Sequence, residues 1–181
     1  MRHDARMTSA PASDFLWTPL HDWPLESILA LQAQAYAPAL REKGAVLQAK
    51  RDASSRMHPL SWAVASALAP TRLCAYAIAC PWRTDMPAQW NHVHLPPLAP
   101  DCLYVHDIAV AADWQGHHLA AGLLQRILDE GDKLGYRQAV LIAVQGAERY
   151  WCRHGFVPDR AAGMSGFGDS AIRMTRVWTG K

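Results

Sequence analysis

The pattern of apolar and polar positions along the chain predicts short strands that alternate with a few helices. Apolar residues at helical spacing and capping or breaking residues predict helices over 25–36, 39–51, 119–134 and 146–154. Short apolar runs bounded by turn residues predict strands over 15–18, 62–66, 73–79, 103–110, 139–144 and 171–178. The order of these elements predicts an α+β fold.

Residues 103–144 are the most informative part of this pattern. A strand is followed there by an amphipathic helix and then by the unbroken apolar run AVLIAV over 139–144. A run that does not alternate is typical of a parallel strand that is buried on both faces. We therefore predict one β-α-β unit with a right-handed crossover, behind an antiparallel front half in which 62–66 and 73–79 form a hairpin.

Length and composition indicate one globular domain. The chain has 181 residues, of which 50% are hydrophobic and 19% are charged, so it can bury a substantial core. We expect a loose polar arm over 1–13 and a single domain over 14–181. Residues 81–100 hold five of the twelve prolines, which predicts a long surface loop.

Charge and cysteine usage narrow the class of protein. The formal net charge is +2 and the basic residues form no run, which argues against a protein that binds nucleic acid through its phosphates. The four cysteines form no CxxC pair, which favours reduced thiols in the cytoplasm. No apolar run approaches the ~20 residues of a membrane-spanning helix, and no signal peptide is present. We expect a soluble cytoplasmic protein.

The turn between the strand 103–110 and the following helix is the first candidate for chemistry. It contains Gly116 and opens a helix, and the free N–H groups at a helix start attract anions such as a pyrophosphate. An ordinary helix entry, with the glycine needed only for the turn, explains the same residues. The turn matches neither a Walker A loop nor GxGxxG.

Four sequence strings, in this order, resemble the GCN5-related N-acetyltransferase (GNAT) family. They are HDIAV over 106–110, QGHHLA over 115–120, AVLIAV over 139–144 and YWCRHGF over 150–156. The closing GFGDSAIRM over 166–174 is similar to the family's last strand. The resemblance covers about residues 15–178. It implies a GNAT-like mixed sheet with an antiparallel N-terminal half, one β-α-β crossover and a short C-terminal helix before the last strand.

The resemblance also implies an acyl-CoA-dependent N-acyltransferase with acetyl-CoA as cosubstrate. Backbone groups of Ile108, Ala109 and Val110 would align the pantetheine arm, as one strand pairs with another. Backbone N–H groups of the turn would hold the pyrophosphate. The turn residues in question are Gln115, Gly116, His117, His118, Leu119 and Ala120.

One turn residue departs from the family's pattern. His118 stands where the family has its central glycine, so either the backbone approaches the phosphate beside a bulky side chain or the loop is shifted. His117 and His118 are either donors to the CoA phosphates or two ordinary exposed histidines.

Transfer of an acetyl group to an amine needs a base, and His106 is the candidate. The string YVHDIAV resembles the H-x-H-x-L-A-V strand of arylalkylamine N-acetyltransferases, with Tyr104 at the first histidine and His106 at the second. The period of two in a strand predicts that Tyr104, His106 and Ile108 share one face, with Asp107 on the other unless a bulge intervenes. A histidine titrates near neutral pH and so can take the amine's proton. A structural histidine bonded to the neighbouring strand explains it equally well.

Trp151 stands where the family has its usual acid, a tyrosine. An indole N–H donates a hydrogen bond but does not titrate, so we expect Trp151 to pack on the pantetheine or to polarise the sulfur. Tyr150 lies about 100° further round the helix and is not expected to take this place. Thiol pKa values lie near 8.5, so the thiolate can leave without an enzymic acid.

Two other functions stay open at this point. A GNAT-shaped acyl-CoA sensor or interaction module without turnover would fit the departures at His118 and Trp151. A zinc site of His92, His94 and His106 would lack any accompanying carboxylate or cysteine pattern, and we predict no metal.

The acceptor is expected to be an amine of a small molecule or a peptide, and neither nucleic acid nor membrane is expected as a partner. Trp82 and Trp90, on the proline-rich segment, either line an apolar acceptor pocket or simply pack in the core. The oligomeric state, a homodimer included, stays open.

Overall fold

The structure is a computed structural model that describes residues 14–93, 97–159 and 163–179. Its strands are β1 (Phe15–Pro19), β2 (Trp62–Ser66), β3 (Ala69–Trp82), β4 (Ala88–Gln89), β5 (Cys102–Val110), β6 (Gln138–Ala143), β7 (Val157–Pro158), β8 (Met164–Ser165) and β9 (Ile172–Val177). Its helices are α1 (Leu25–Ala35), α2 (Gly44–Asp52), α3 (Leu119–Lys133) and α4 (Glu148–Arg153), with the 3₁₀ turns η1 (Leu20–Asp22), η2 (Pro38–Leu40) and η3 (Ala112–Trp114). The arm predicted over 1–13 lies outside the described residues.

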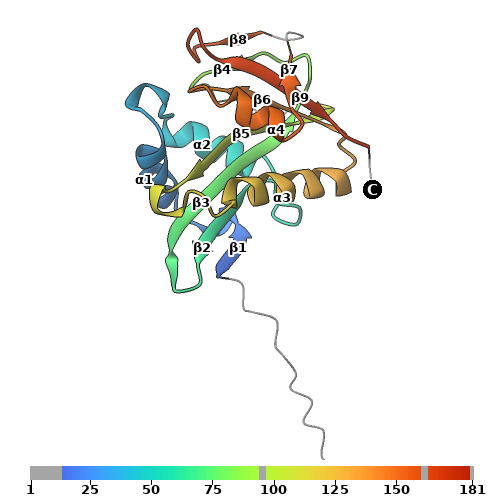
Figure 1. Cartoon of the computed structure of the whole chain (residues 1–181). Coiled ribbons are helices and arrows are strands. Elements are labelled where there is room, and N and C mark those ends of the chain that lie inside the picture. Colours follow the sequence, from blue (N-terminus) through green and yellow to red (C-terminus); the bar gives the residue numbers. More distant parts are fainter. Residues whose placement is uncertain (1–13, 94–96, 160–162, 180–181) are drawn as a thin grey trace, which may run out of the picture.

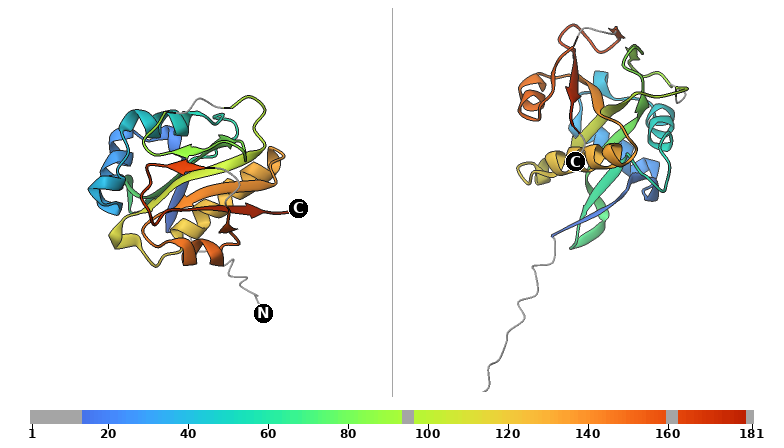
Figure 2. Two further views of the ribbon diagram at one scale, coloured as in Figure 1. Left: turned by 90° about the horizontal axis from the view of Figure 1, so that it is seen from above. Right: turned by 90° about the vertical axis from the view of Figure 1, so that its right-hand side faces the viewer.

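Helices cover both faces of one large sheet, as Figures 1 and 2 show. The seven strands of this sheet follow the order β1-β2-β3-β5-β6-β9-β7, and β4 pairs with β8 in a small second sheet. The leucine-rich stripe of α3 packs on one face, and α1 and α2 cover the other. A Cβ on Gly122 would lie 2.6 Å from the ring of Trp17, so this glycine allows α3 to approach the sheet closely.

The predicted α+β architecture is confirmed. The strands β1, β2, β3 and β5 are antiparallel neighbours, β5 and β6 are parallel, and α3 connects these two. The second helix begins at Gly44 rather than at 39, because η2 forms a separate turn and the backbone at Arg41 and Lys43 is extended. This extended segment carries Glu42.

The second hairpin strand is longer than predicted and runs through Pro81, the first residue of the predicted loop. β2 pairs with β3 only as far as Ala77, opposite Trp62. Alternation along β3 directs the backbone of Pro81 toward the side of β2, beyond that last pair. The missing N–H of the proline therefore leaves no gap in a ladder.

β5 and β6 are paired only at their beginnings. Leu103 and Tyr104 lie opposite Ala139 and Val140, and no further pair joins the two strands along their described lengths. The N–H of Ala111 donates to the carbonyl of Cys74 just beyond the β5–β3 ladder (2.9 Å). Since backbone groups alternate in an antiparallel ladder, those of residues 108 and 110 point away from β3, into the gap that the diverging strands open.

A β-bulge at His106 changes which side chains share a face. Asp107 lies opposite Ile78 and Val105 opposite the next residue of β3, so His106 is an extra residue in β5. Ile108 packs with the core under α3, whereas His106 and Asp107 both contact side chains from the α1 and α2 side. The prediction that His106 and Ile108 share a face is therefore wrong, and the alternative with a bulge is correct.

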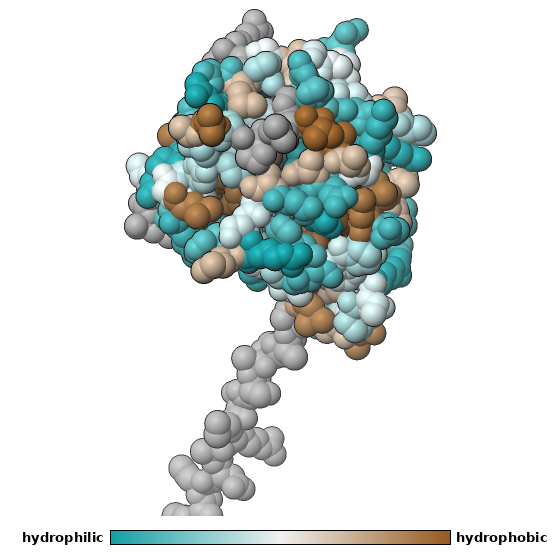
Figure 3. Space-filling view, turned by 180° about the vertical axis from the view of Figure 1, so that it is seen from behind, coloured by the Kyte–Doolittle hydropathy of each residue, from teal (hydrophilic) through white to brown (hydrophobic). Residues whose placement is uncertain are grey.

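None of the helices in the described part of the chain combines the length and the apolar composition required to cross a bilayer. On the face shown in Figure 3, hydrophobic residues lie in separate spots among hydrophilic ones rather than in one broad patch.

Candidate active site

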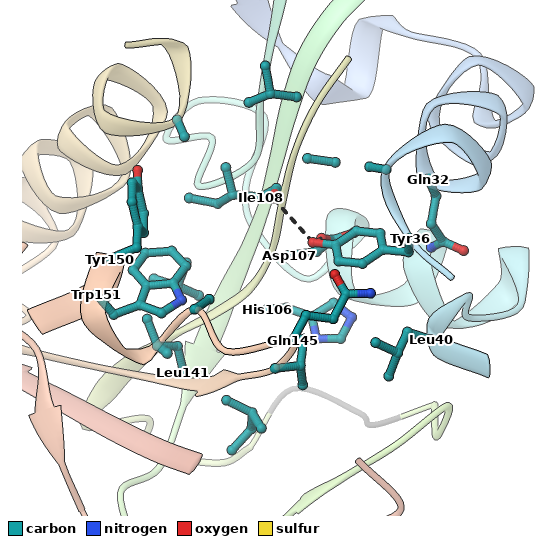
Figure 4. A pocket seen from close by; sticks show the side chains of 18 of the residues that line it. Gln32, Tyr36, Leu40, His106, Asp107, Ile108, Leu141, Gln145, Tyr150 and Trp151 are labelled. Carbon is teal, nitrogen blue, oxygen red and sulfur yellow. Dashed lines mark hydrogen bonds between the residues drawn. The ribbon is translucent and has the colours of Figure 1, made fainter. Parts of the chain in front are cut away.

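The diverging strands open a cleft of about 350 Å³. Its walls come from β5, β6, α1, α4, the start of α3 and the loops that carry Trp90 and Phe167. Seven of the predicted site residues line it: His106, Ile108, Ala109, Val110, Gln115, Ala120 and Trp151. Figure 4 shows Tyr150 and Trp151 on one side of the cleft and Gln32, Tyr36 and Leu40 on the other, with Ile108, His106 and Gln145 between them.

The turn before α3 presents backbone N–H groups at one end of the cleft. Gly116 has a φ of +84° and His118 a φ of +58°, so two residues of this turn are in the left-handed region. Within the described residues, the first N–H of α3 with a backbone acceptor is that of Gly122, which donates to the carbonyl of His118 (3.0 Å). The N–H groups of residues 119–121 are therefore available to an anion, as at most helix starts.

The side chains of the turn point in different directions. Ala120 and Gln115 line the cleft, whereas Leu119 is buried in the core. His117 packs its ring against Phe15 and Trp114, with ring centroids 5.8 Å and 5.5 Å apart. Gly116, His117, His118 and Leu119 do not line the cleft, so the turn can contribute only backbone groups from these positions unless the exposed His118 ring moves.

His118 adopts the conformation that the family's glycine would favour. It is the N-cap residue of α3, and its backbone lies in the left-handed region. This conformation costs a residue with a side chain roughly 1–2 kcal/mol. The imidazole is exposed and so does not fill the cleft.

Three ionisable side chains meet at the other end of the cleft, and we call them the Glu42–His106–Lys50 cluster. The Nε2 of His106 is hydrogen-bonded to one carboxylate oxygen of Glu42, and Lys50 donates to the other (3.4 Å). Lys50 Nζ also lies 3.3 Å from Nδ1 and 3.1 Å from Nε2 of His106. The three side chains are only 2–3% exposed. Glu42 and His106 line the cleft, and Lys50 lies behind them.

The environment of Glu42 keeps it ionised. Burial alone would raise the pKa of Glu42, but His106, Lys50 and the backbone N–H of Asn91 together lower it to about 2. The Asn91 N–H donates to Oε1 at 2.9 Å. Since a carboxylate only accepts hydrogen bonds, the Nε2 of His106 must carry the hydrogen in this pair. Burial lowers the pKa of Lys50, and Glu42 opposes that effect.

Asp107, beside this cluster, is held by two tyrosines. Its oxygens accept hydrogen bonds from the hydroxyls of Tyr36 and Tyr76, both at 2.5 Å. Burial raises the pKa of Asp107 and raises the pKa values of both tyrosines well above 10. The Tyr36 hydroxyl also lies 3.2 Å from the carbonyl of Ile108, the contact drawn as a dashed line in Figure 4. This network fixes the Tyr36 ring at the edge of the cleft.

Tyr104, predicted as a catalytic residue beside His106, does not line the cleft. It is 2% exposed and packs between Trp82 and His106, with ring centroids at 5.0 Å and 5.3 Å. Its place is behind the bulge, where it supports the ring of His106, and we assign it no contact with substrate.

Trp151 and Tyr150 both line the cleft, although their separation round the helix suggested that only one would. Figure 4 shows the indole nitrogen of Trp151 toward the middle of the cleft, and the hydroxyl of Tyr150 directed away from that ring. Burial raises the pKa of Tyr150, so its hydroxyl is protonated at neutral pH. A tyrosine side chain thus lines the cleft one position before the family's tyrosine.

Two aromatic side chains close the cleft near Glu42. Trp90 and Phe167, from the two loops joined by β4 and β8, have ring centroids 5.5 Å apart and line the cleft together. A Cβ on Gly166 would lie 2.7 Å from Cβ of Trp90, so the two loops are in close contact. Of the two interpretations of Trp90, that of a pocket wall agrees with this geometry, whereas Trp82 is a buried core residue.

The histidines of the zinc hypothesis do not form a metal site in the described part of the chain. His106 contacts Glu42 and Lys50, His92 is exposed, and His94 lies outside the described residues. No group of three His, Cys, Asp or Glu side chains within the described ranges could hold a metal ion.

Sequence reasoning missed several residues of this site, chiefly Glu42, Lys50 and Tyr36. Glu42 and Lys50 lie in the charged string REKGAVLQAK, which is typical of a solvated helix start. Lys50 is eight residues after Glu42, roughly two turns of a helix apart, and this spacing was a weak signal that both could face the same side.

The comparison with protein families identifies the class of protein. The Acetyltransferase (GNAT) family matches residues 21–156, which is well over half of the chain. The chain therefore belongs to the GNAT acetyltransferase family. A comparison with curated proteins found no match.

Solved structures share the fold over nearly the whole chain. The NatC complex bound to Gag peptide and CoA gives a TM-score of 0.67 at 15% identity, covering 92% of this chain and 99% of that chain. The GphF GNAT-like decarboxylase in complex with isobutyryl-CoA gives 0.67 at 16%, covering 90% and 98%. The ribosomal-protein-S18-alanine N-acetyltransferase from Escherichia coli gives 0.63 at 16%, covering 92% and 96%. The chain thus shares one fold with these three structures over nearly its whole length.

Proposed function

We propose that the protein transfers an acetyl group from acetyl-CoA to a primary amine of a small molecule or a peptide, by direct attack in a ternary complex. The observation that carries this proposal is the composition of the cleft. One continuous cleft joins a helix start with free N–H groups to a buried carboxylate–imidazole pair. The helix start can bind the pyrophosphate of CoA, and the carboxylate–imidazole pair can accept a proton from the amine. The reaction needs both.

The cofactor end would bind CoA chiefly through backbone groups. The pyrophosphate would accept hydrogen bonds from the N–H groups of the turn 115–120, and the pantetheine amides would pair with the free edge of β5 at Ile108 and Val110. The same edge offers an N–H to the thioester carbonyl, where negative charge develops during attack. Trp151 would pack beside the sulfur.

The other end would supply the base. A primary amine reaches the enzyme as an ammonium ion and must lose a proton before its nitrogen can attack. The new C–N bond then forms as the C–S bond breaks, and CoA leaves as a thiolate. The attacking nitrogen loses its second proton as the amide forms, and the thiolate takes up this proton to give the CoA thiol. We assign the amine's proton to His106, which is 3% exposed in its side chain, so that a water molecule in the cleft would carry the proton to the imidazole.

The residues that line the cleft near Glu42 and His106 favour an acceptor amine with an uncharged substituent. Trp90, Phe167, Leu40 and Tyr36 supply apolar or aromatic surface, and no lysine or arginine lines the cleft among the described residues. The carboxylates of the cleft already accept hydrogen bonds from protein groups, so they offer little to a second ammonium of a polyamine.

The experiment is turnover with acetyl-CoA against a panel of alkyl and aryl amines, polyamines, amino acids and peptides. Release of the CoA thiol is followed directly, and mass spectrometry checks for the N-acetylated product. We expect amine-dependent CoA release, with uncharged amine substituents preferred. Tight binding of acetyl-CoA by calorimetry, without CoA release from any amine, would instead establish a binding module without turnover.

A further inference from the structure

Lys50 is a buried cation that lies behind His106 and does not line the cleft. Its side chain is 2% exposed, and its Nζ lies within 3.4 Å of both ring nitrogens of His106 and of Glu42 Oε1. It comes from the last turn of α2, whereas His106 is the bulged residue of β5. The contact therefore depends on the tertiary fold and not on neighbouring residues in the chain.

The cluster has one buried carboxylate and two groups that could neutralise it. Lysine is ordinarily more basic than imidazole by about four pH units. Two cations in contact disfavour each other, so Glu42 favours a single counterion, either Lys50 or His106. The greater basicity of lysine assigns the charge to Lys50. The Glu42 carboxylate on Nε2–H then fixes the neutral imidazole in one tautomer, with the ammonium 3.1 Å from Nε2 and 3.3 Å from Nδ1.

Other ionisable groups face His106 and do not change this assignment. The Asp107 carboxylate is next to His106 in β5, and the hydroxyls of Tyr36, just after α1, and of Tyr76 from β3 each donate to one of its oxygens. Its negative charge favours a cation at either Lys50 or His106, so it leaves lysine the more basic of the two. Burial raises the pKa of Tyr104 well above 10 and that of Cys80, which faces Lys50 from β3, to about 12, so both are neutral.

Stability is a weak explanation for a buried cluster of this kind. Replacement of a buried ion pair by apolar residues is often neutral or stabilising, because desolvation of the charges offsets their attraction. An effect of Lys50 on the protonation of His106 would explain why the lysine is buried at this place.

We infer that Lys50 is a positioning residue that acts through His106: its ammonium neutralises Glu42 and thereby holds the imidazole neutral and correctly oriented to take the acceptor amine's proton. The role in proton transfer rests on the proposed function. The electrostatic coupling of Lys50 to His106 does not, and it can be measured without any substrate.

The test is an NMR titration of the histidine side chains in Lys50→Met, Glu42→Gln and the wild type, with the signal of His106 assigned from its loss in His106→Gln. Without the ammonium, the buried carboxylate can be neutralised only by the imidazole, so in Lys50→Met we expect the titration midpoint to rise by at least about one pH unit. In Glu42→Gln the cation remains without its counterion, and the midpoint should fall. Lys43→Met, an exposed lysine next to Glu42, is the matched control and should leave the midpoint unchanged.

Turnover gives the second readout. If the protein is an acyltransferase, the acidic limb of the pH profile of kcat/KM should move to higher pH in Lys50→Met by the same amount as the NMR midpoint. Equal midpoints in Lys50→Met, Glu42→Gln and wild type would overturn the inference, whatever the activity. A shift in the NMR midpoint with no turnover by any variant or wild type would leave the coupling intact and contradict the proposed function alone.

Discussion

The two ends of the cleft are built from different parts of the polypeptide. The end proposed to bind the cofactor, called the cofactor end below, consists of backbone groups from one continuous segment, residues 108–120, at an exposed turn. The end proposed to accept the proton, called the proton-accepting end, consists of side chains from three separate segments, Glu42, Lys50 and His106, all buried. A backbone site depends on conformation and tolerates unusual side chains such as His118, whereas a side-chain site is lost when one functional atom is removed.

The largest effect is expected from removal of the imidazole at the proton-accepting end. His106→Ala should reduce kcat/KM by about 10² to 10⁴, because the amine's proton loses its acceptor, while acetyl-CoA affinity should change little. His106→Gln keeps a hydrogen-bonding group but cannot take a proton in this pH range, and it should be similarly slow. Steady-state kinetics and calorimetry on the same preparations measure the two quantities.

The acceptor's own ionisation can imitate the pH dependence of an enzymic base. The profiles should therefore be compared for two amines of different pKa. An inflection that follows the amine, together with near wild-type turnover in His106→Gln, would make His106 a structural residue and leave the base unassigned.

A smaller effect is expected at the cofactor end, on affinity alone. Ala120→Glu places a negative charge in the cleft beside the N–H groups proposed to hold the pyrophosphate, and it should weaken acetyl-CoA binding at least tenfold, about 1.4 kcal/mol. Ala121→Glu adds the same charge to the same helix start but outside the cleft lining, and it is the matched control. Calorimetry that finds equal affinities in the two variants would move the pyrophosphate elsewhere.

His118 offers a test of the claim that the turn acts through its conformation. His118→Gly removes a side chain from the left-handed region and should stabilise the fold by about 1 kcal/mol, as measured by urea unfolding. Acetyl-CoA affinity should stay the same or improve. A clear loss of affinity would show that the imidazole itself contacts the cofactor.

The smallest effect is expected from Trp151→Tyr, which restores the family's tyrosine. We expect turnover to be kept or raised, since the indole is assigned to packing, whereas Trp151→Ala should weaken cofactor binding by opening a cavity. Tyr150→Phe is the companion variant, because the Tyr150 side chain also lines the cleft. A collapse of turnover in Trp151→Tyr with intact affinity would give the indole a specific part in the reaction.

The same difference between the two ends explains what the sequence could predict. The order of strands and helices, the β5–α3–β6 unit and the anion-attracting turn depend on local patterns, and the fold follows them closely. Glu42 and Lys50 have no local signal, because their charges lie in a string typical of a solvated surface and become buried only when α2 packs near β5. The face of His106 depended on a single bulge, which strand periodicity alone does not specify.

The central claim is that one end of the cleft binds the cofactor and the other accepts the proton. The most direct test is the rate of CoA release by Ala120→Glu and His106→Gln, each measured at saturating acetyl-CoA and saturating amine. If one end binds the cofactor and the other accepts the proton, Ala120→Glu should recover a rate near that of the wild type once enough acetyl-CoA is present. His106→Gln should stay slow at any concentration. Recovery of both variants, or of His106→Gln alone, would contradict the assignment of the two ends.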